Sequence, residues 1–193
     1  MLTDYCDNGL TDKNTVHSYL EVYQSLFEKK QLTATQVLEV GIGPYIDSNA
    51  GSIRMWAKFF PNADVHGCDV ISIDNVHPCV INHPRIHLHT SNNAYNQKFI
   101  ATKFTSKGIT FDIVVDDGPH TLESMIQFIT LYLPLLKADG ILVIEDVQDI
   151  AWLETLTQVT PDAFKPYIQK YDRRSVKGRY DDIMFVINKA CVE

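Results

Sequence analysis

The sequence predicts an α/β fold in which helices cover both faces of a mostly parallel sheet. Short apolar runs alternate along the chain with longer segments of helical period, as expected for strands joined by crossover helices. Two runs, 111–116 and 141–145, are almost continuously apolar and β-branched, which is typical of central strands buried on both faces. At 193 residues, the chain suits a single domain with one core.

Seven strands and the helices between them are expected, with residues 1–33 as a helical cap and 34–193 as the core. The first helix is predicted at 15–30, where apolar residues recur at helical spacing. The remaining elements follow in chain order: a strand at 36–40, a helix at 52–60, strands at 64–69 and 85–90, a helix at 94–106, a strand at 111–116, a crossover helix at 122–137, a strand at 141–145, a helix beginning near Asp149, and strands at 167–171 and 183–188. The strand at 85–90 is expected at an edge, and the last two as an antiparallel pair that closes the sheet.

Charge and composition exclude several functions. The formal net charge is −7, whereas a protein that mainly binds nucleic acid needs an excess of Lys and Arg. The four cysteines lie far apart and form no C-x-x-C pair, which indicates a reducing compartment. No apolar run is long enough to span a bilayer, and residues 1–8 do not resemble a signal peptide. We therefore expect a cytoplasmic protein that binds neither nucleic acid nor membrane.

A ligand-binding turn is predicted after the first strand, at the sheet edge where open α/β sheets bind ligands. Glu39, Gly41 and Gly43 lie there, and Asp69 ends the second strand, where an acid can accept both ribose hydroxyls of an adenosine. The third glycine of the dinucleotide motif G-x-G-x-x-G is absent. This favours S-adenosylmethionine, which has no pyrophosphate, over a nicotinamide dinucleotide; a turn that binds nothing is the alternative.

Doubled acids follow both central strands: Asp116 with Asp117, and Glu145 with Asp146. If these strands are neighbours, four carboxylates share one pocket, and their mutual repulsion is relieved at least cost by a cation. Oxygen ligands suit a hard ion such as Mg²⁺. Capping of the following helices would explain one acid per junction but not two.

His120 follows Asp117 by three residues, at the start of the crossover helix. A base with a pKa near neutral can remove a hydroxyl proton in this position. A solvent-facing histidine at a helix start is the alternative. The remaining histidines, including the His87-x-His89 pair, are expected to have no role in the site.

The motifs together resemble the metal-dependent sugar O-methyltransferases of antibiotic biosynthesis, which are class I S-adenosylmethionine-dependent enzymes with a Rossmann-like seven-stranded sheet. The matching segments are 11–13, 37–43, 51–56, 59–62, 116–120 and 144–146. The resemblance departs at Pro119, where the family usually has Ser. The chain is also short, so we expect it to lack the extra N-terminal domain of the macrolide enzymes.

The resemblance implies a role for each matching residue. Mg²⁺, or Mn²⁺, would be bound by Asp117, Glu145 and Asp146, with His120 as the catalytic base. The donor-binding residues would be Glu39, Gly41, Gly43, Arg54, Asp69, Ser91, Asn92 and Asp116. The acceptor would be a hydroxyl of a deoxysugar such as rhamnose, in a glycan or a glycosylated natural product. Two kinds of partner remain open: a second copy of the chain in a homo-oligomer, and glycosyltransferase modules to which the chain is fused or bound.

Two other functions remain as alternatives. A catechol-type O-methyltransferase also uses carboxylate-bound Mg²⁺, but it acts on aromatic diols, so an aromatic-lined pocket would favour it and a polar one would favour sugar. A non-catalytic module would bind the donor without transferring the methyl group.

Overall fold

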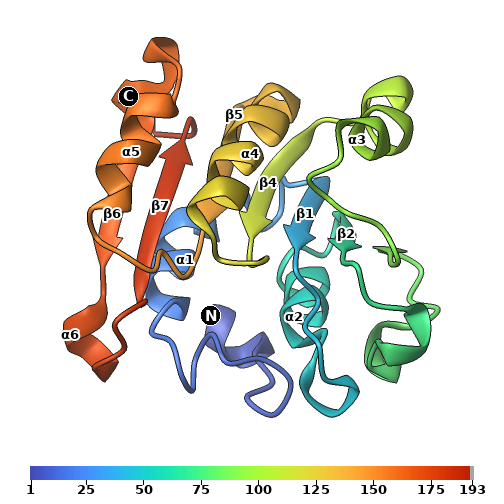
Figure 1. Ribbon diagram of the computed structural model, residues 1–193. Coiled ribbons are helices and arrows are strands. Elements are labelled where there is room, and N and C mark those ends of the chain that lie inside the picture. Colours follow the sequence, from blue (N-terminus) through green and yellow to red (C-terminus); the bar gives the residue numbers. More distant parts are fainter. Residues whose placement is uncertain (192–193) are drawn as a thin grey trace.

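The computed structural model describes residues 1–191 and contains a seven-stranded sheet in the order β3-β2-β1-β4-β5-β7-β6 (Figure 1). The strands are β1 (Gln36–Val40), β2 (Asp64–Cys68), β3 (Ile86–His89), β4 (Phe111–Asp116), β5 (Leu136–Ile144), β6 (Ile168–Asp172) and β7 (Ile183–Asn188). Strand β7 runs antiparallel to both of its neighbours, and the other pairs are parallel. The predicted fold class, the edge position of the third strand and the closing antiparallel pair are confirmed.

Helices form a layer on each face of the sheet. They are α1 (Leu20–Phe27), α2 (Gly51–Phe59), α3 (Gln97–Lys103), α4 (Leu122–Tyr132), α5 (Trp152–Val159) and the short α6 (Arg174–Lys177). One apolar cluster joins α1 and α2 to one face, and a second joins α3, α4 and α5 to the other. The alternation of side chains along each strand supplies both clusters, because successive residues point to opposite faces. No helix in residues 1–191 is long and apolar enough to cross a membrane.

Three helices are shorter than predicted, and β5 begins earlier than expected. Helix α1 begins at Leu20 rather than at residue 15, because the segment before it turns its polar side chains toward buried acids. Helix α4 ends at Tyr132, followed by a 3-10 turn that contains Pro134, and β5 already begins at Leu136. A proline inside a helix removes a hydrogen bond, which explains the earlier stop. Helix α3 begins after Asn96, whose side chain accepts hydrogen bonds from the first turn.

Strands β4 and β5 are direct neighbours, as the acidic pattern required. Asp116 pairs with Ile144 in the register, so the residues that follow, Asp117 and Glu145, leave the sheet side by side. Strand β1 flanks β4 on its other side, with Val40 opposite Asp116. Three strand ends therefore open at one edge of the sheet.

Candidate active site

The turn after β1 is shaped to receive the chain that follows β4. Gly41 has φ +99°, and a Cβ there would collide with the backbone carbonyl of Asp117. The Asp117 amide donates a hydrogen bond to the Val40 carbonyl at 2.8 Å. Only glycine permits both this positive φ and this close approach. The glycine therefore fixes the distance between the turn after β1 and the acidic segment after β4.

A buried cluster of Glu39, Asp117 and Glu145 surrounds the ammonium group of Lys13. The Lys13 Nζ lies 2.7 Å from Asp117 Oδ2 and 3.3 Å from Glu39 Oε1, and it also donates a hydrogen bond to Glu145 Oε2. Tyr23 donates its hydroxyl proton to Glu145 Oε1. Both Glu145 oxygens are thus occupied by protein donors. Removing one partner of such a buried pair costs about 3–5 kcal/mol.

One lysine cannot balance three buried acids, and the pKa values reflect this. Burial raises the pKa of Glu39 to about 7 against the effect of Lys13, and burial raises the pKa of Glu145 well above its ordinary value. Burial opposes ionisation of Asp117 too, but Lys13 and the His120 hydrogen bond lower its pKa to about 2. Asp117 is therefore the residue that stays charged and available to a further cation.

The expectation that Asp116, Asp117, Glu145 and Asp146 share one pocket was wrong for Glu145, which lies in the Lys13 cluster, and for Asp116. Asp116 is buried and accepts a hydrogen bond from the Tyr95 hydroxyl. Burial raises the pKa of Asp116 to about 7, against the effect of that hydrogen bond. Neighbouring residues leave a strand in opposite directions, so two consecutive acids do not enter the same site.

A second cluster, formed by Asp117, His120 and Asp146, faces a cavity. His120 Nε2 lies 3.2 Å from Asp117 Oδ1 and 3.5 Å from Asp146 Oδ2, and one ligand atom from each residue falls within 4.8 Å of the others. The other Asp146 oxygen accepts a hydrogen bond from the Tyr19 hydroxyl, with His17 Nδ1 at 3.2 Å. Burial disfavours charge on His120, but the hydrogen bond to Asp117 and the nearby acids raise its pKa.

The cavity-facing cluster depends on two residues with left-handed backbone. His120 has φ +54° and Asp146 has φ +52°, a conformation that costs about 1–3 kcal/mol for residues other than glycine. Such strain persists only where surrounding contacts enforce it. Here it turns both side chains toward Asp117 at the ends of β4 and β5.

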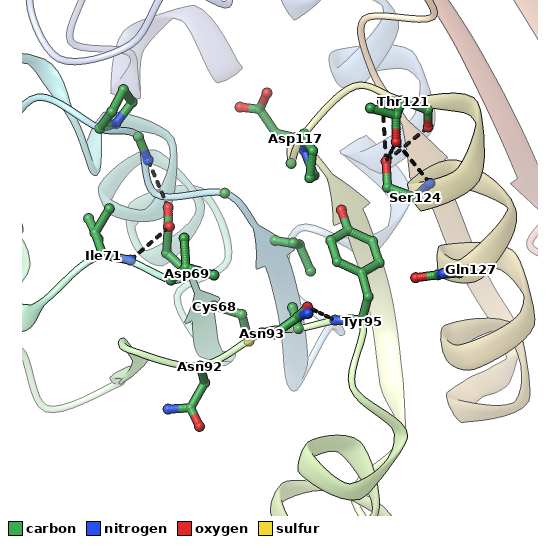
Figure 2. Close-up of a pocket in the computed structure, with 18 of the residues that line it drawn as sticks. Cys68, Asp69, Ile71, Asn92, Asn93, Tyr95, Asp117, Thr121, Ser124 and Gln127 are labelled. Carbon is green, nitrogen blue, oxygen red and sulfur yellow. Dashed lines mark hydrogen bonds between the residues drawn. The ribbon is translucent and has the colours of Figure 1, made fainter.

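A cavity of about 580 Å³ lies between the loops after β1, β2 and β3 and the start of α4 (Figure 2). Four of the predicted donor residues line it: Gly41, Gly43, Asp69 and Asn92. The Asp69 carboxylate accepts hydrogen bonds from three backbone amides, those of Ile42 at 2.7 Å, Gly43 at 3.2 Å and Ile71 at 3.1 Å. Asp69 therefore holds the glycine turn against the end of β2.

The other four predicted donor residues lie outside that lining. Glu39 is buried in the Lys13 cluster and accepts a hydrogen bond from the Trp56 ring at 3.0 Å. Asp116 lies behind Tyr95. Ser91 adopts a left-handed backbone and donates its amide to Ile71 at 2.7 Å. Arg54, on α2, pairs with Asp7 at 3.2 Å.

A second cavity, of about 440 Å³, adjoins the first. The two share Gly43, Pro44, Asp117 and Gly118, and only the second is lined by His120 and Asp146. Segment 8–15 contributes much of its wall, including Thr11, Asp12 and Thr15. A group transferred from a ligand in the first cavity to one in the second would pass directly beside the Asp117 cluster.

The sequence interpretation missed Lys13 and Tyr95. The sequence interpretation includes Lys13 only as part of a matching motif, because its position before a helix does not indicate that it is buried. The acid-rich strand ends were the available signal, since buried carboxylates require a partner. Tyr95 follows the Ser91-Asn92 turn and lines the first cavity, and no spacing in the sequence links it to Asp116.

Several known proteins are similar to this chain in sequence. It is 29% identical over 144 residues to the 8-demethyl-8-alpha-L-rhamnosyl tetracenomycin-C 2'-O-methyltransferase of Streptomyces olivaceus, covering 74% of this chain and 36% of that protein. It is 27% identical over 139 residues to the mycinamicin VI 2''-O-methyltransferase of Micromonospora griseorubida, covering 71% and 33%. No family model matches the chain. The chain thus spans about a third of the length of these relatives.

A solved structure shows the same fold. The MycE methyltransferase of the mycinamycin biosynthetic pathway, in complex with Mg and SAH, superposes with a TM-score of 0.73 at 23% identity. The match covers 97% of this chain and 54% of that one. The chain therefore has the Rossmann-like fold of class I methyltransferases, and its homologues are sugar O-methyltransferases.

Proposed function

We propose that this chain, with its class I methyltransferase fold and its sugar O-methyltransferase homologues, transfers a methyl group from S-adenosylmethionine to a sugar hydroxyl with the help of Mg²⁺. The observation that carries this is the Asp117, His120 and Asp146 cluster at the junction of two cavities. The relatives are named as O-methyltransferases of a rhamnosyl tetracenomycin and of mycinamicin VI, which supports a sugar or glycoside acceptor.

The donor atoms of the cluster fit a hard divalent cation. Asp117 and Asp146 each keep one oxygen on a buried donor, Lys13 or Tyr19, and turn the other toward His120. Carboxylates of this kind bind Mg²⁺ and leave positions for oxygens of water or substrate. Asp117 and Asp146 would hold the ion, and Glu145 would join them only by releasing Lys13 or Tyr23. The ion would stabilise negative charge that develops on the acceptor oxygen.

His120 is placed to act as the general base. A hydroxyl that approaches the free oxygens of Asp117 and Asp146 meets the imidazole at Nε2, the nitrogen nearest to both. His120 can take the proton there only in its neutral form, after giving up its hydrogen bond to Asp117. Proton removal by a positioned base contributes about 10²–10⁴-fold in rate.

The first cavity would hold the methyl donor. Gly41 and Gly43 let a ligand approach the backbone closely, and Asp69 and Asn92 line the same cavity. S-adenosylmethionine supplies the methyl group as a sulfonium. Gly118 and Pro119 would then separate the donor from the acceptor except where the two cavities join.

The lining of the second cavity favours a sugar over a catechol. Carboxylates and hydroxyls predominate in it, and Tyr45 is the one Phe, Tyr or Trp among its described lining residues. An aromatic diol would need flat apolar walls, whereas a sugar needs many hydrogen-bonding partners. Acceptor hydroxyls would be met by Thr11, Asp12 and Thr15.

Transfer from labelled S-adenosylmethionine to a panel of deoxysugar glycosides, with catechol in parallel, tests the proposal. We expect product from a glycoside in the presence of Mg²⁺ and none in excess EDTA. Full activity in EDTA would refute the metal's role, and transfer to catechol alone would identify the other substrate class. Donor binding without transfer to any acceptor would support the non-catalytic alternative.

A further inference from the structure

We propose that Lys13 is a positioning residue: a fixed internal cation that occupies the buried cluster of Glu39, Asp117 and Glu145 and leaves a single metal position, at Asp117 and Asp146 beside His120. The inference rests on the proposed metal dependence of the site. It concerns cation binding and stability alone, so its test needs neither methyl donor nor acceptor.

The Lys13 ammonium group lies where a metal would otherwise be bound. Ligand atoms of Glu39, Asp117 and Glu145 come within 4.8 Å of one another, and the Lys13 Nζ contacts all three residues. The Lys13 side chain is only 2% exposed. A buried group of three carboxylates without this lysine would attract a divalent cation of its own.

Asp117 belongs to both clusters and divides its oxygens between them. Oδ2 faces Lys13 at 2.7 Å, while Oδ1 faces His120 at 3.2 Å. Lys13 therefore fixes the orientation of the Asp117 carboxylate and prevents Oδ2 from binding a second ion. The lysine also places a positive charge close to the cavity-facing position, which weakens cation binding there.

Hydrogen bonds from other elements also hold the segment that carries Lys13. Lys177, on α6, donates hydrogen bonds to the backbone carbonyls of Asn14, Thr15 and His17. Ser18 is anchored to Asp182 through its amide at 3.2 Å. The same segment lines the second cavity at Thr11, Asp12 and Thr15. Lys13 is thus one of several contacts, some buried and some exposed, that hold this segment against the rest of the protein.

Mn²⁺ binding to the full chain, without donor or acceptor, tests the inference. Isothermal titration and electron paramagnetic resonance would be compared for the unmodified chain and Lys13→Met, which keeps an unbranched side chain one atom shorter and removes the charge. We expect one bound Mn²⁺ in the unmodified chain and two in Lys13→Met. The metal-free variant should melt at a lower temperature, and Mn²⁺ should restore most of that loss.

The matched control is Lys13→Arg, which keeps the charge and should still bind one Mn²⁺. A purely structural role would lower the melting temperature of Lys13→Met equally with and without Mn²⁺, and no second ion would bind. That result would overturn the inference. If Lys13→Met does not fold without metal, Lys13→Met combined with Glu39→Gln removes one acid, and its refolding on addition of Mn²⁺ gives the same comparison.

Failure of the proposed function is distinguishable from failure of this inference. An unmodified chain that binds no Mn²⁺ would refute the metal's role in methyl transfer. Gain of one Mn²⁺ by Lys13→Met would even then support the role of Lys13, and the absence of any gain would refute it.

Discussion

Asp117 and Asp146 are arranged as a pair: each turns one carboxylate oxygen toward His120, at 3.2 and 3.5 Å, and keeps its other oxygen on a buried donor of the N-terminal segment. The donors are Lys13 for Asp117 and the Tyr19 hydroxyl for Asp146. The free oxygens are consequently preorganised before any ligand arrives, and preorganisation reduces the cost of binding.

Asp146→Asn is expected to weaken Mn²⁺ binding at least about tenfold, because a neutral amide replaces a charged ligand. Titration calorimetry would measure the change. Asp12→Asn is the matched control, since Asp12 lines the same cavity but is not part of the Asp117, His120 and Asp146 cluster. Equal weakening in both variants would argue against a specific ligand role for Asp146.

His120→Ala is expected to reduce methyl transfer by about 10²–10⁴-fold, the range for loss of a general base. Affinity for S-adenosylhomocysteine should stay within a few-fold, because His120 does not line the donor cavity. Turnover of labelled donor and calorimetry would measure the two quantities. His87→Ala, an exposed change on the edge strand β3, should leave both unchanged. Retained turnover in His120→Ala would remove the imidazole from the mechanism.

Gly41→Ala is expected to destabilise the fold by about 2–4 kcal/mol, since the new Cβ meets the Asp117 carbonyl and the backbone has a positive φ. Gly108→Ala is the control: its φ is +65°, but nothing lies within 4 Å of the added Cβ. Backbone strain alone should cost about 1–2 kcal/mol there. Urea unfolding would measure both, and equal losses would contradict the proposed close approach.

Acid should destabilise the protein through a histidine pair on β2 and β3. His66 Nδ1 lies 3.1 Å from His89 Nε2, and burial together with neighbouring positive charges lowers the pKa of His66 to about 3 and that of His89 to about 4. The unfolded chain therefore binds more protons below about pH 6.5, the ordinary histidine pKa. The free energy of unfolding should fall as pH falls through this window and stop falling near the folded-state values.

His66→Gln isolates that contribution, because the carboxylates of the site also titrate. The loss of unfolding free energy between about pH 7 and about pH 5 should be smaller in the variant by roughly 1–2 kcal/mol. Urea unfolding at the two pH values would measure it. His77→Gln, at a half-buried loop histidine, serves as control, and an unchanged pH dependence in His66→Gln would disprove the assignment.

Much of the fold was determined by the sequence itself. Continuous apolar runs predicted β4 and β5 as central strands, and alternating polarity predicted β3 at an edge. These patterns are local: burial on one or two faces dictates which residue types a strand can carry. The acids at the strand ends were recognisable for the same reason, since parallel neighbours end at one edge of the sheet.

Only the tertiary structure decided which partner each of those acids contacts. It directs Asp116 to Tyr95, brings Glu39 to Asp117 and Glu145, and fills the space among them with Lys13. The first helix is shorter than its periodicity predicts because side chains of the preceding segment contact these buried acids. Long-range electrostatics of this kind depends on which residues meet in space, about a hundred positions apart along the chain, and no local pattern in the sequence encodes it.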